Sequence, residues 1–216
     1  MQQAEPSVEL LDTGSGDGRF KEALSALFDG NGTIYIVSGY FTYQGYRSIR
    51  EDIVDFLERS PDNRLVVIVG PASDQFSPRI ARDLWQLDDG DQVEVRKHAW
   101  GLHAKLYLRD GPEPRLITGS ANITQVAFEY NLELNIAYSR ESRDDPDIAA
   151  FREWVTALAE ESEPLRRRDL LTPVLVGSSF INWSNKARLL PKRNVALRVV
   201  PILLLLAMFA IGARVI

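Results

Sequence analysis

The sequence has no cysteine and only two histidines, His98 and His103, among its 216 residues. Without cysteine the chain can form no disulfide, no thiolate nucleophile and no zinc-thiolate site. Two histidines also make a dedicated transition-metal site a poor expectation. We therefore expect chemistry that needs neither a metal nor a cofactor.

Acidic residues are almost missing from the last quarter of the chain. Residues 165–216 carry nine Arg and Lys side chains against one acid, whereas residues 1–164 carry sixteen bases against twenty-nine acids. The negative charge of residues 1–164 disfavours nonspecific binding of nucleic acid to this part of the chain, unless the acidity is a surface adaptation that high salt screens. The chain length suits one α/β domain over residues 1–164 plus an appendage.

Long apolar runs are missing except near the C-terminus. Residues 1–11 are polar and acidic, so we expect no secretory signal and a cytoplasmic main domain. Residues 199–213 contain no polar side chain and lie between Arg198 and Arg214. This run is shorter than the roughly 20 residues that comfortably span a bilayer, so its length alone does not decide its role.

The composition around this run favours a membrane anchor over residues 195–216, preceded by a basic linker over residues 165–194. The run has no polar face, its flanking arginines can reach the head groups, and basic residues in the linker can touch anionic lipid. Bases on the N-terminal side of the run place that side in the cytoplasm: Lys186, Arg188, Lys192, Arg193 and Arg198. A core helix and a peripheral segment are the alternatives. A wholly cytoplasmic protein is the corresponding alternative location.

Apolar runs and helix-period patterns alternate through the main domain. We expect residues 1–18 to form a loop that ends in a glycine-rich stretch. Buried strands are predicted at residues 33–41, 65–69, 93–97, 102–108, 116–118 and 132–138. Amphipathic helices are predicted at residues 20–28, 49–57, 80–87 and 148–159. This alternation predicts an α/β fold in which helices cover both faces of a mixed β-sheet, with a further apolar helix at the C-terminus.

Two short motifs follow one another in the predicted strands. Residues 103–110 read HxKxxxxD and residues 119–122 read GSxN. Side chains at positions i and i+2 of a strand point to the same face, so His103 and Lys105 are expected side by side. A turn between the motifs returns the chain as an adjacent strand. The serine and asparagine of the second motif, again two residues apart, then approach the same pocket.

These motifs resemble those of the phospholipase D superfamily, in its single-motif, nuclease-like branch. The resemblance implies that His103 attacks phosphorus and forms a phosphohistidine. It also implies that Lys105 and Asn122, helped by Ser120, hold the nonbridging oxygens of the phosphoryl group. The implied activity is metal-independent phosphodiester hydrolysis.

The resemblance extends over residues 33–138. The segment at residues 38–42 is similar to a strand-to-helix turn of the nuclease-like branch. Glu133 matches the family's acid that hydrogen-bonds the other ring nitrogen of the nucleophile. Asp110 fits the motif, but we expect its role to be structural rather than chemical.

The implied chemistry needs two imidazoles, one as nucleophile and one as the general acid that protonates the leaving oxygen. His98 has no lysine two residues further on, so we interpret it as a structural or exposed residue. A two-fold homodimer would place two copies of His103 face to face. We therefore expect each active site to be shared by two chains.

The substrate class is left open by the sequence. Nucleic acid is favoured because the resemblance is to the short, single-motif branch. Phospholipid is the runner-up because the tail would hold the site near a membrane, and a noncatalytic, membrane-attached interaction protein is a third hypothesis. Residues 10–18 also resemble the glycine-rich loop of S-adenosylmethionine-dependent methyltransferases, but the next predicted strand lacks the terminal acid that binds the ribose.

Overall fold

The computed structural model describes residues 7–13, 18–70, 76–88, 91–99 and 101–166, all within one compact unit, Met1–Leu171. The predicted anchor, its apolar helix and all but the first two residues of the predicted linker lie outside these residues. No helix in the described ranges is long and apolar enough to cross a membrane. The anchor over residues 195–216 therefore stays a prediction.

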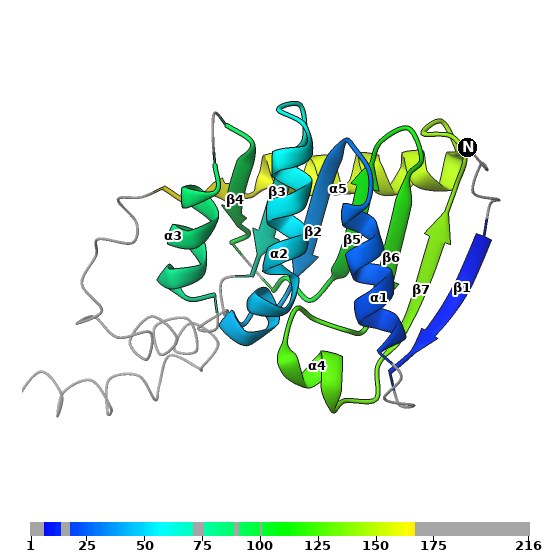
Figure 1. Cartoon of the computed structure of the whole chain (residues 1–216), viewed down its shortest axis with the longest axis horizontal. Coiled ribbons are helices and arrows are strands. Elements are labelled where there is room, and N and C mark those ends of the chain that lie inside the picture. The colour runs from blue at the N-terminus through cyan, green and yellow to red at the C-terminus, as the bar shows by residue number, and fades with distance from the viewer. Residues whose placement is uncertain (1–6, 14–17, 71–75, 89–90, 100, 167–216) are drawn as a thin grey trace, which may run out of the picture. The chain divides into compact units, whose positions relative to one another are not determined.

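Eight strands form one sheet in the order β1-β7-β6-β5-β2-β3-β4-β8 (Figure 1). The strands are β1 (Ser7–Asp12), β2 (Thr33–Ser38), β3 (Arg64–Val69), β4 (Val93–Lys97), β5 (Lys105–Asp110), β6 (Arg115–Gly119), β7 (Leu134–Ser139) and β8 (Glu163–Pro164). The α-helices are α1 (Arg19–Ser25), α2 (Tyr43–Arg59), α3 (Pro78–Gln86), α4 (Gln125–Glu129) and α5 (Pro146–Glu161), and a 3₁₀ turn, η1 (Ala26–Phe28), follows α1.

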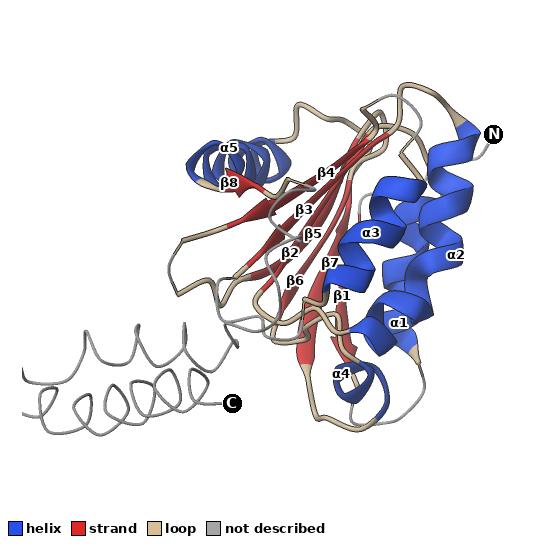
Figure 2. Cartoon of the chain, turned by 90° about the vertical axis from the view of Figure 1, so that its left-hand side faces the viewer, coloured by secondary structure: helices blue, strands red, loops and turns tan. Residues whose placement is uncertain are grey.

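The sheet is mixed. β2, β3 and β4 are parallel neighbours, joined by the crossover helices α2 and α3, whereas every other pairing is antiparallel. Figure 2 shows α1, α2 and α3 on one face of the sheet and α5 on the other. The predicted α/β fold, with helices on both faces of a mixed sheet, is confirmed.

The core consists of two apolar layers because successive strand side chains point to opposite faces. In β2, Ile36 packs into the layer beneath α1, α2 and α3, whereas its neighbour Val37 packs into the layer beneath α5. Both layers meet on β5, where every residue is buried. This double coverage explains why the central strands read as continuous apolar runs.

The expectation of a loop over residues 1–18 is wrong, because Ser7–Asp12 form β1, an edge strand antiparallel to β7. Only Leu11 of this strand is buried, since no further strand and little helix covers it. The weak apolar pattern of an edge strand is what made it resemble a loop. An antiparallel edge strand also does not fit the methyltransferase alternative, in which this segment would lead a parallel strand into a cofactor loop.

Two other expectations need correction. The strand predicted from residue 102 begins at Lys105, so His103 lies just before it, in a segment without regular secondary structure. The short helix α4 was not predicted, because five residues are too few to show a helical period. Its start is marked by Thr124, whose Oγ1 accepts a hydrogen bond from Ala127 N at 3.1 Å.

The topology gathers the chemistry at one edge of the sheet. β2 ends at this edge with Ser38, and its antiparallel neighbour β5 begins there with Lys105 opposite Ser38. β6 ends at the same edge with Gly119, and β7 begins there with Leu134. The segments that carry both motifs therefore converge, although they are separate in the sequence.

Candidate active site

The imidazole of His103 and the ammonium of Lys105 lie side by side. The Lys105 Nζ is 3.2 Å from His103 Nδ1 and donates a hydrogen bond to the main-chain oxygen of His103. His103 is exposed, whereas Lys105 is buried under the surrounding strands. The predicted nucleophile is thus open to solvent, and the predicted phosphate clamp is fixed beside it.

Burial gives Lys105 an unusual electrostatic setting. Desolvation lowers the pKa of its ammonium below the ordinary 10.5, and the negative charge of Glu133 opposes this shift. A partly desolvated cation interacts more strongly with an anion than an exposed one does.

The amide of Asn122 is held in one orientation. Its Oδ1 accepts a hydrogen bond from the main-chain nitrogen of Tyr40 at 3.1 Å, and a weaker share at 3.3 Å from the Ser38 hydroxyl, whose nearer acceptor is the Tyr40 main-chain oxygen at 2.6 Å. The Nδ2 is then the group of this side chain that is left to donate to a ligand. The turn after β2 therefore orients a hydrogen-bond donor of the second motif.

Gly39 allows this turn to approach the His103 segment. A Cβ at Gly39 would lie 2.8 Å from the Leu102 main-chain oxygen and 3.4 Å from the Cα of His103. Any larger residue would push against the main chain that carries the imidazole. Close approach of main chains explains a glycine here.

Ser120 and Glu133 are bonded to each other. The Ser120 hydroxyl donates to Glu133 Oε2 and accepts from Leu134 N at 3.0 Å. Asn131 Nδ2 donates to the other carboxylate oxygen of Glu133 at 3.0 Å. Among the described contacts Glu133 thus holds Ser120 and Asn131, and the expected hydrogen bond to the imidazole of His103 is not formed.

Asp110 is not brought to this edge. It ends β5 five residues after Lys105, about 16 Å away at the usual rise of a strand. Its buried carboxylate accepts hydrogen bonds from Arg143 and from Arg152, which precedes the middle of α5. Its place among the catalytic residues is not supported by this geometry, and the structural role expected for it fits.

The second histidine, His98, follows β4. Its Nδ1 is 3.3 Å from the hydroxyl of Ser162, and its main-chain nitrogen donates to Val69 O at 2.9 Å. These contacts hold His98 beside β4 and β8. In the strand order, β2 and β3 separate β4 from β5, which follows His103. These contacts agree with a structural role.

Three residues that the motifs do not include support the site. Ser38 orients Asn122, as described above. The Tyr107 hydroxyl donates to Ala121 O at 2.6 Å, and Asn135 Oδ1 accepts from Ala121 N at 3.1 Å. Burial raises the pKa of Tyr107, so its hydroxyl stays a donor. The sequence could have indicated Tyr107, because it lies two residues after Lys105 and therefore on the same face of the strand.

The described residues bring no three imidazole, carboxylate or thiol groups together in a way that would hold a metal ion. Independence from metal and cofactor stays a prediction, to be tested by chelation.

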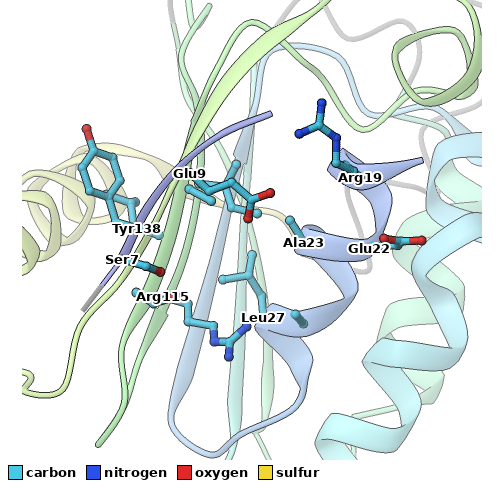
Figure 3. Close-up of a pocket in the computed structure, with 13 residues that line it drawn as sticks. Ser7, Glu9, Arg19, Glu22, Ala23, Leu27, Arg115 and Tyr138 are labelled. Carbon is cyan, nitrogen blue, oxygen red and sulfur yellow. The ribbon is translucent and has the colours of Figure 1, made fainter. Parts of the chain in front are cut away.

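Two pockets lie at opposite edges of the sheet. A groove of about 440 Å³ near the candidate site is lined by Ala104, Lys105, Leu106, Thr118, Gly119, Ala150, Phe151 and Trp154. A pocket of about 330 Å³ lies between α1 and the strands β6, β7 and β1, where Arg115 and Glu9 point into it (Figure 3). The second pocket is near the start of β6, and the motifs are at its end.

A comparison with known protein families shows to which family the chain belongs. Residues 25–155, more than half of the sequence, match the family model described as "Cardiolipin synthase, PLD-like domain". The chain belongs to the phospholipase D superfamily. The match includes every predicted site residue. The family membership predicted from the two motifs is therefore confirmed.

Solved structures of phospholipase D relatives share this fold. NucT from Helicobacter pylori is 16% identical, with a TM-score of 0.57, and the match covers 74% of this chain and all of NucT. Nuc from Salmonella typhimurium, a phospholipase D family member, is 17% identical, with a TM-score of 0.58, and covers 75% of this chain and 99% of Nuc. Phosphatidylserine synthase from Haemophilus influenzae is 16% identical, with a TM-score of 0.54, covering 74% of this chain but 40% of the synthase. No curated protein matches the sequence.

The arrangement places a side chain that can act as a nucleophile next to groups that can bind an anion. An exposed imidazole lies beside a buried ammonium, and an oriented amide lies in the segment that follows the neighbouring strand β6. Such donors stabilise the charge that develops on a phosphoryl group during displacement. The side chains at this end of the sheet are therefore of the kinds that phosphoryl transfer requires.

Proposed function

We propose that the protein is a phosphodiesterase that acts through a phosphohistidine formed on His103. The observation that carries this proposal is the 3.2 Å contact between His103 Nδ1 and Lys105 Nζ at an exposed edge of the sheet. A nucleophile with a cation beside it can attack a phosphorus whose negative charge would otherwise repel it.

The reaction proceeds in two displacements. A ring nitrogen of His103 forms a bond to phosphorus while the bond to the leaving oxygen breaks, and a general acid gives that oxygen a proton. Water then attacks phosphorus, losing its proton to the same acid–base group, and the bond from nitrogen to phosphorus breaks. Lys105 and Asn122 hold the nonbridging oxygens in both steps, and Ser120 helps them when its hydroxyl turns its proton from Glu133 to the phosphoryl group.

The general acid is the His103 of a second chain. The one other histidine, His98, is engaged with Ser162 and Val69. In-line displacement needs its nucleophile and its acid on opposite sides of phosphorus. A two-fold homodimer supplies the second imidazole from the same motif.

Nucleic acid is the substrate class we favour. Two relatives with the names Nuc and NucT are covered almost completely by the match, which fits a short chain with one motif. A phospholipid is the second candidate, favoured by the apolar groove beside Ala104 and Lys105 and by the description of the family model. A noncatalytic interaction protein that keeps only the fold is the third.

Membrane attachment through residues 195–216, with the phospholipase D-like domain on the cytoplasmic side, remains part of the proposal. Its support is the apolar run at residues 199–213 and the bases before it. Recovery of the full chain in the soluble fraction without detergent would reject it.

The test is a trapping experiment with the full chain. The protein is mixed in EDTA with phosphate-labelled nucleic acid or with labelled anionic phospholipid, quenched in alkali, and assayed for acid-labile label on histidine. Label on the wild type and on His98→Ala, but not on His103→Ala, is expected. Turnover that needs Mg²⁺ or Zn²⁺, or turnover by His103→Ala, would contradict the mechanism, and no label with either substrate would favour the noncatalytic hypothesis.

A further inference from the structure

The pocket of about 330 Å³ beneath α1 lies at the other end of the strands from the motifs. The strands β6, β7 and β1 form its floor, and α1 and η1 form its wall. The proposed chemistry uses none of its residues. We call it the α1 pocket. The side chains on its floor come from three neighbouring strands: Ser7, Glu9, Arg115, Ile117, Ala137 and Ser139.

A row of polar side chains crosses this floor. Ser7 is opposite Ser139, which is itself opposite Arg115. Arg115 is in turn opposite Arg109 of β5. Directly opposed side chains of neighbouring strands lie on one face, roughly 5 Å apart at their Cβ atoms. It is the face beneath α1, because Ile117, two residues after Arg115, packs into that layer of the core.

The two arginines of the row repel each other. Arg109 is buried and donates only to main-chain oxygens, of which that of Glu113 is at 2.7 Å. Burial, and then the positive charge of Arg115, lower the pKa of Arg109 to about 10. The carboxylates of Glu113 and Asp29 oppose this shift, but no described ion pair joins them to either arginine. Like charges directly opposite each other destabilise a strand pair, so an anion beside Arg115 would relieve the repulsion.

Arg115 has donors without a protein acceptor. Its guanidinium carries five N–H groups, and in the part of the chain that the structure describes none of them donates to another residue. The side chain is half-buried, where polar groups normally find a partner. The hydroxyls of Ser7 and Ser139 likewise make no hydrogen bond with a described residue. The row therefore offers a guanidinium and two hydroxyls to the oxygens of a ligand.

Glu9 supplies a charge of the opposite sign. It lies two residues after Ser7 in β1 and therefore on the same face. Figure 3 shows Glu9 and Arg115 both pointing from the sheet into the pocket, with Ala23 and Leu27 on the helix side. β7 separates the strands of Glu9 and Arg115, and no described ion pair joins the two. Opposite charges that line one pocket without pairing can bind two parts of one ligand.

The wall of the pocket adds no net charge. Arg19 and Glu22 line it from α1, one cation and one acid, beside the apolar side chains of Ala23 and Leu27. Cations and acids therefore balance in the whole lining. A ligand with a single charge would leave either Glu9 or Arg115 unmatched, whereas a ligand with both charges matches both. The volume is at the lower end of that of small-molecule sites.

We propose that the α1 pocket binds a small zwitterion, with an oxyanion held by Arg115 and the two serine hydroxyls and an ammonium held by Glu9. The oxyanion is a carboxylate or a phosphate, since guanidinium and hydroxyl groups donate to both. The site does not depend on the proposed function, because it lies at the opposite end of the strands from His103. Such a ligand would join β1 to β6, and it would stabilise an edge strand of which only Leu11 is buried.

The test follows alanine methyl groups by NMR in the full chain, in detergent micelles. The probes are γ-aminobutyrate and phosphoethanolamine, with acetate and inorganic phosphate as the oxyanions that lack an ammonium. The methyl groups of Ala23 and Ala137 line the α1 pocket, whereas Ala104 lies beside His103. The first two should shift, and at least one zwitterion should bind more tightly than its matching oxyanion. Shifts at Ala104 alone, or no shift with any probe, would overturn the proposal.

Arg115→Gln removes the cation that holds the oxyanion. The dissociation constant of the bound zwitterion should rise by roughly 10-fold or more, as for loss of hydrogen bonds to a charged group. Arg82→Gln is the matched control, because Arg82 is an exposed arginine on α3, outside the α1 pocket. It should leave the affinity unchanged. Equal losses in the two variants would indicate a general attraction to positive charge and would reject the site.

Glu9→Gln separates the two charges of the ligand. Glu9 is exposed, so the change is compatible with the fold. The zwitterion should bind roughly 3-fold more weakly, as for loss of an exposed ion pair. Acetate and phosphate should bind no more weakly than before, because the removed carboxylate repels them. An unchanged affinity for the zwitterion would show that Glu9 does not hold the ammonium, contrary to the proposal.

Hydrogen exchange of the β1 amides gives a second measurement. A bound zwitterion should slow the exchange of these amides in the wild type, because it joins β1 to the strands beyond β7. The same concentration should have little effect in Arg115→Gln. Equal slowing in both chains, or none in the wild type, would mean that the ligand does not join β1 to Arg115 and would overturn the proposal.

Discussion

Asp110 and Arg143 form a two-pronged ion pair at the far edge of the sheet from His103. Arg143 Nε donates to Asp110 Oδ1 at 2.7 Å, and Arg143 Nη2 donates to Oδ2 at 2.6 Å. The aspartate side chain is 3% exposed, whereas the arginine side chain is 58% exposed. The last residue of the HxKxxxxD motif therefore fastens the loop before α5 to the end of β5.

This pair predicts that Asp110→Asn reduces stability and leaves chemistry intact. Arg143 is largely in solvent, so we expect a loss of about 1–2 kcal/mol, near the lower end for hydrogen bonds to charged groups. Denaturant unfolding measures the loss, and turnover per folded molecule should equal that of the wild type. Asp144→Asn, an exposed neighbour, is the control. A large loss of turnover at unchanged stability would give Asp110 a catalytic role after all.

Asn122→Asp should be more damaging than its size suggests. The new carboxylate keeps the acceptor that Tyr40 N and Ser38 Oγ bond, but it replaces the donor Nδ2 with a negative oxygen that repels a phosphoryl group. We expect turnover to fall by roughly 100-fold or more, as for loss of an oxyanion donor. Gln125→Ala, a polar change on nearby α4, should have little effect. Wild-type turnover in Asn122→Asp would remove this residue from the site.

The ammonium of Lys105 should lose its proton at lower pH than an ordinary lysine does, because burial lowers the pKa of Lys105. The charge of Glu133 opposes this shift, so Glu133→Gln should lower the pKa further. The chain has only five lysines, and NMR of labelled lysine side chains can follow each one, with Lys105→Arg for assignment. A pKa of Lys105 that rises in Glu133→Gln would contradict the electrostatics described here.

Mixing wild-type and His103→Ala chains tests the shared site. If each site needs both imidazoles, mixed dimers are inactive. At equal amounts and random pairing, activity per wild-type chain should then fall by about half. Activity that stays proportional to the wild-type chains would place the second group within one chain. His98 would then be the first residue to replace.

The central part of the fold could be predicted because its strands are buried on both faces. Residues 65–69 and the start of the 33–41 run are apolar throughout, and the structure has β3 and β2 there. Edge strand β1 could not be predicted in this way, since only Leu11 of its six residues is buried. Its existence depends on pairing with β7, a contact that no local pattern shows.

The sequence predicts which residues form the candidate site better than it predicts the contacts between them. The motifs indicated His103, Lys105, Ser120 and Asn122, and the sheet brings their segments to one edge. The partner of Glu133 could not be predicted, because its carboxylate bonds to Ser120 and Asn131 through a turn whose shape depends on tertiary packing. The support from Tyr107 and Asn135 depends on the same packing.

The pairing of β1 with β7 also sets an order in time. Thr13, at the end of β1, accepts a hydrogen bond from Glu133 N at 2.7 Å and donates to Asn131 O at 2.7 Å, across 120 and 118 residues of sequence. A ribosome adds roughly 5–20 residues per second, so β1 waits for seconds after its synthesis before β7 exists to receive it. Until then β1 lacks the strand with which it pairs. A nascent chain therefore carries the complete HxKxxxxD motif well before it can arrange the residues around it, and activity is expected to arise only once the whole sheet has emerged.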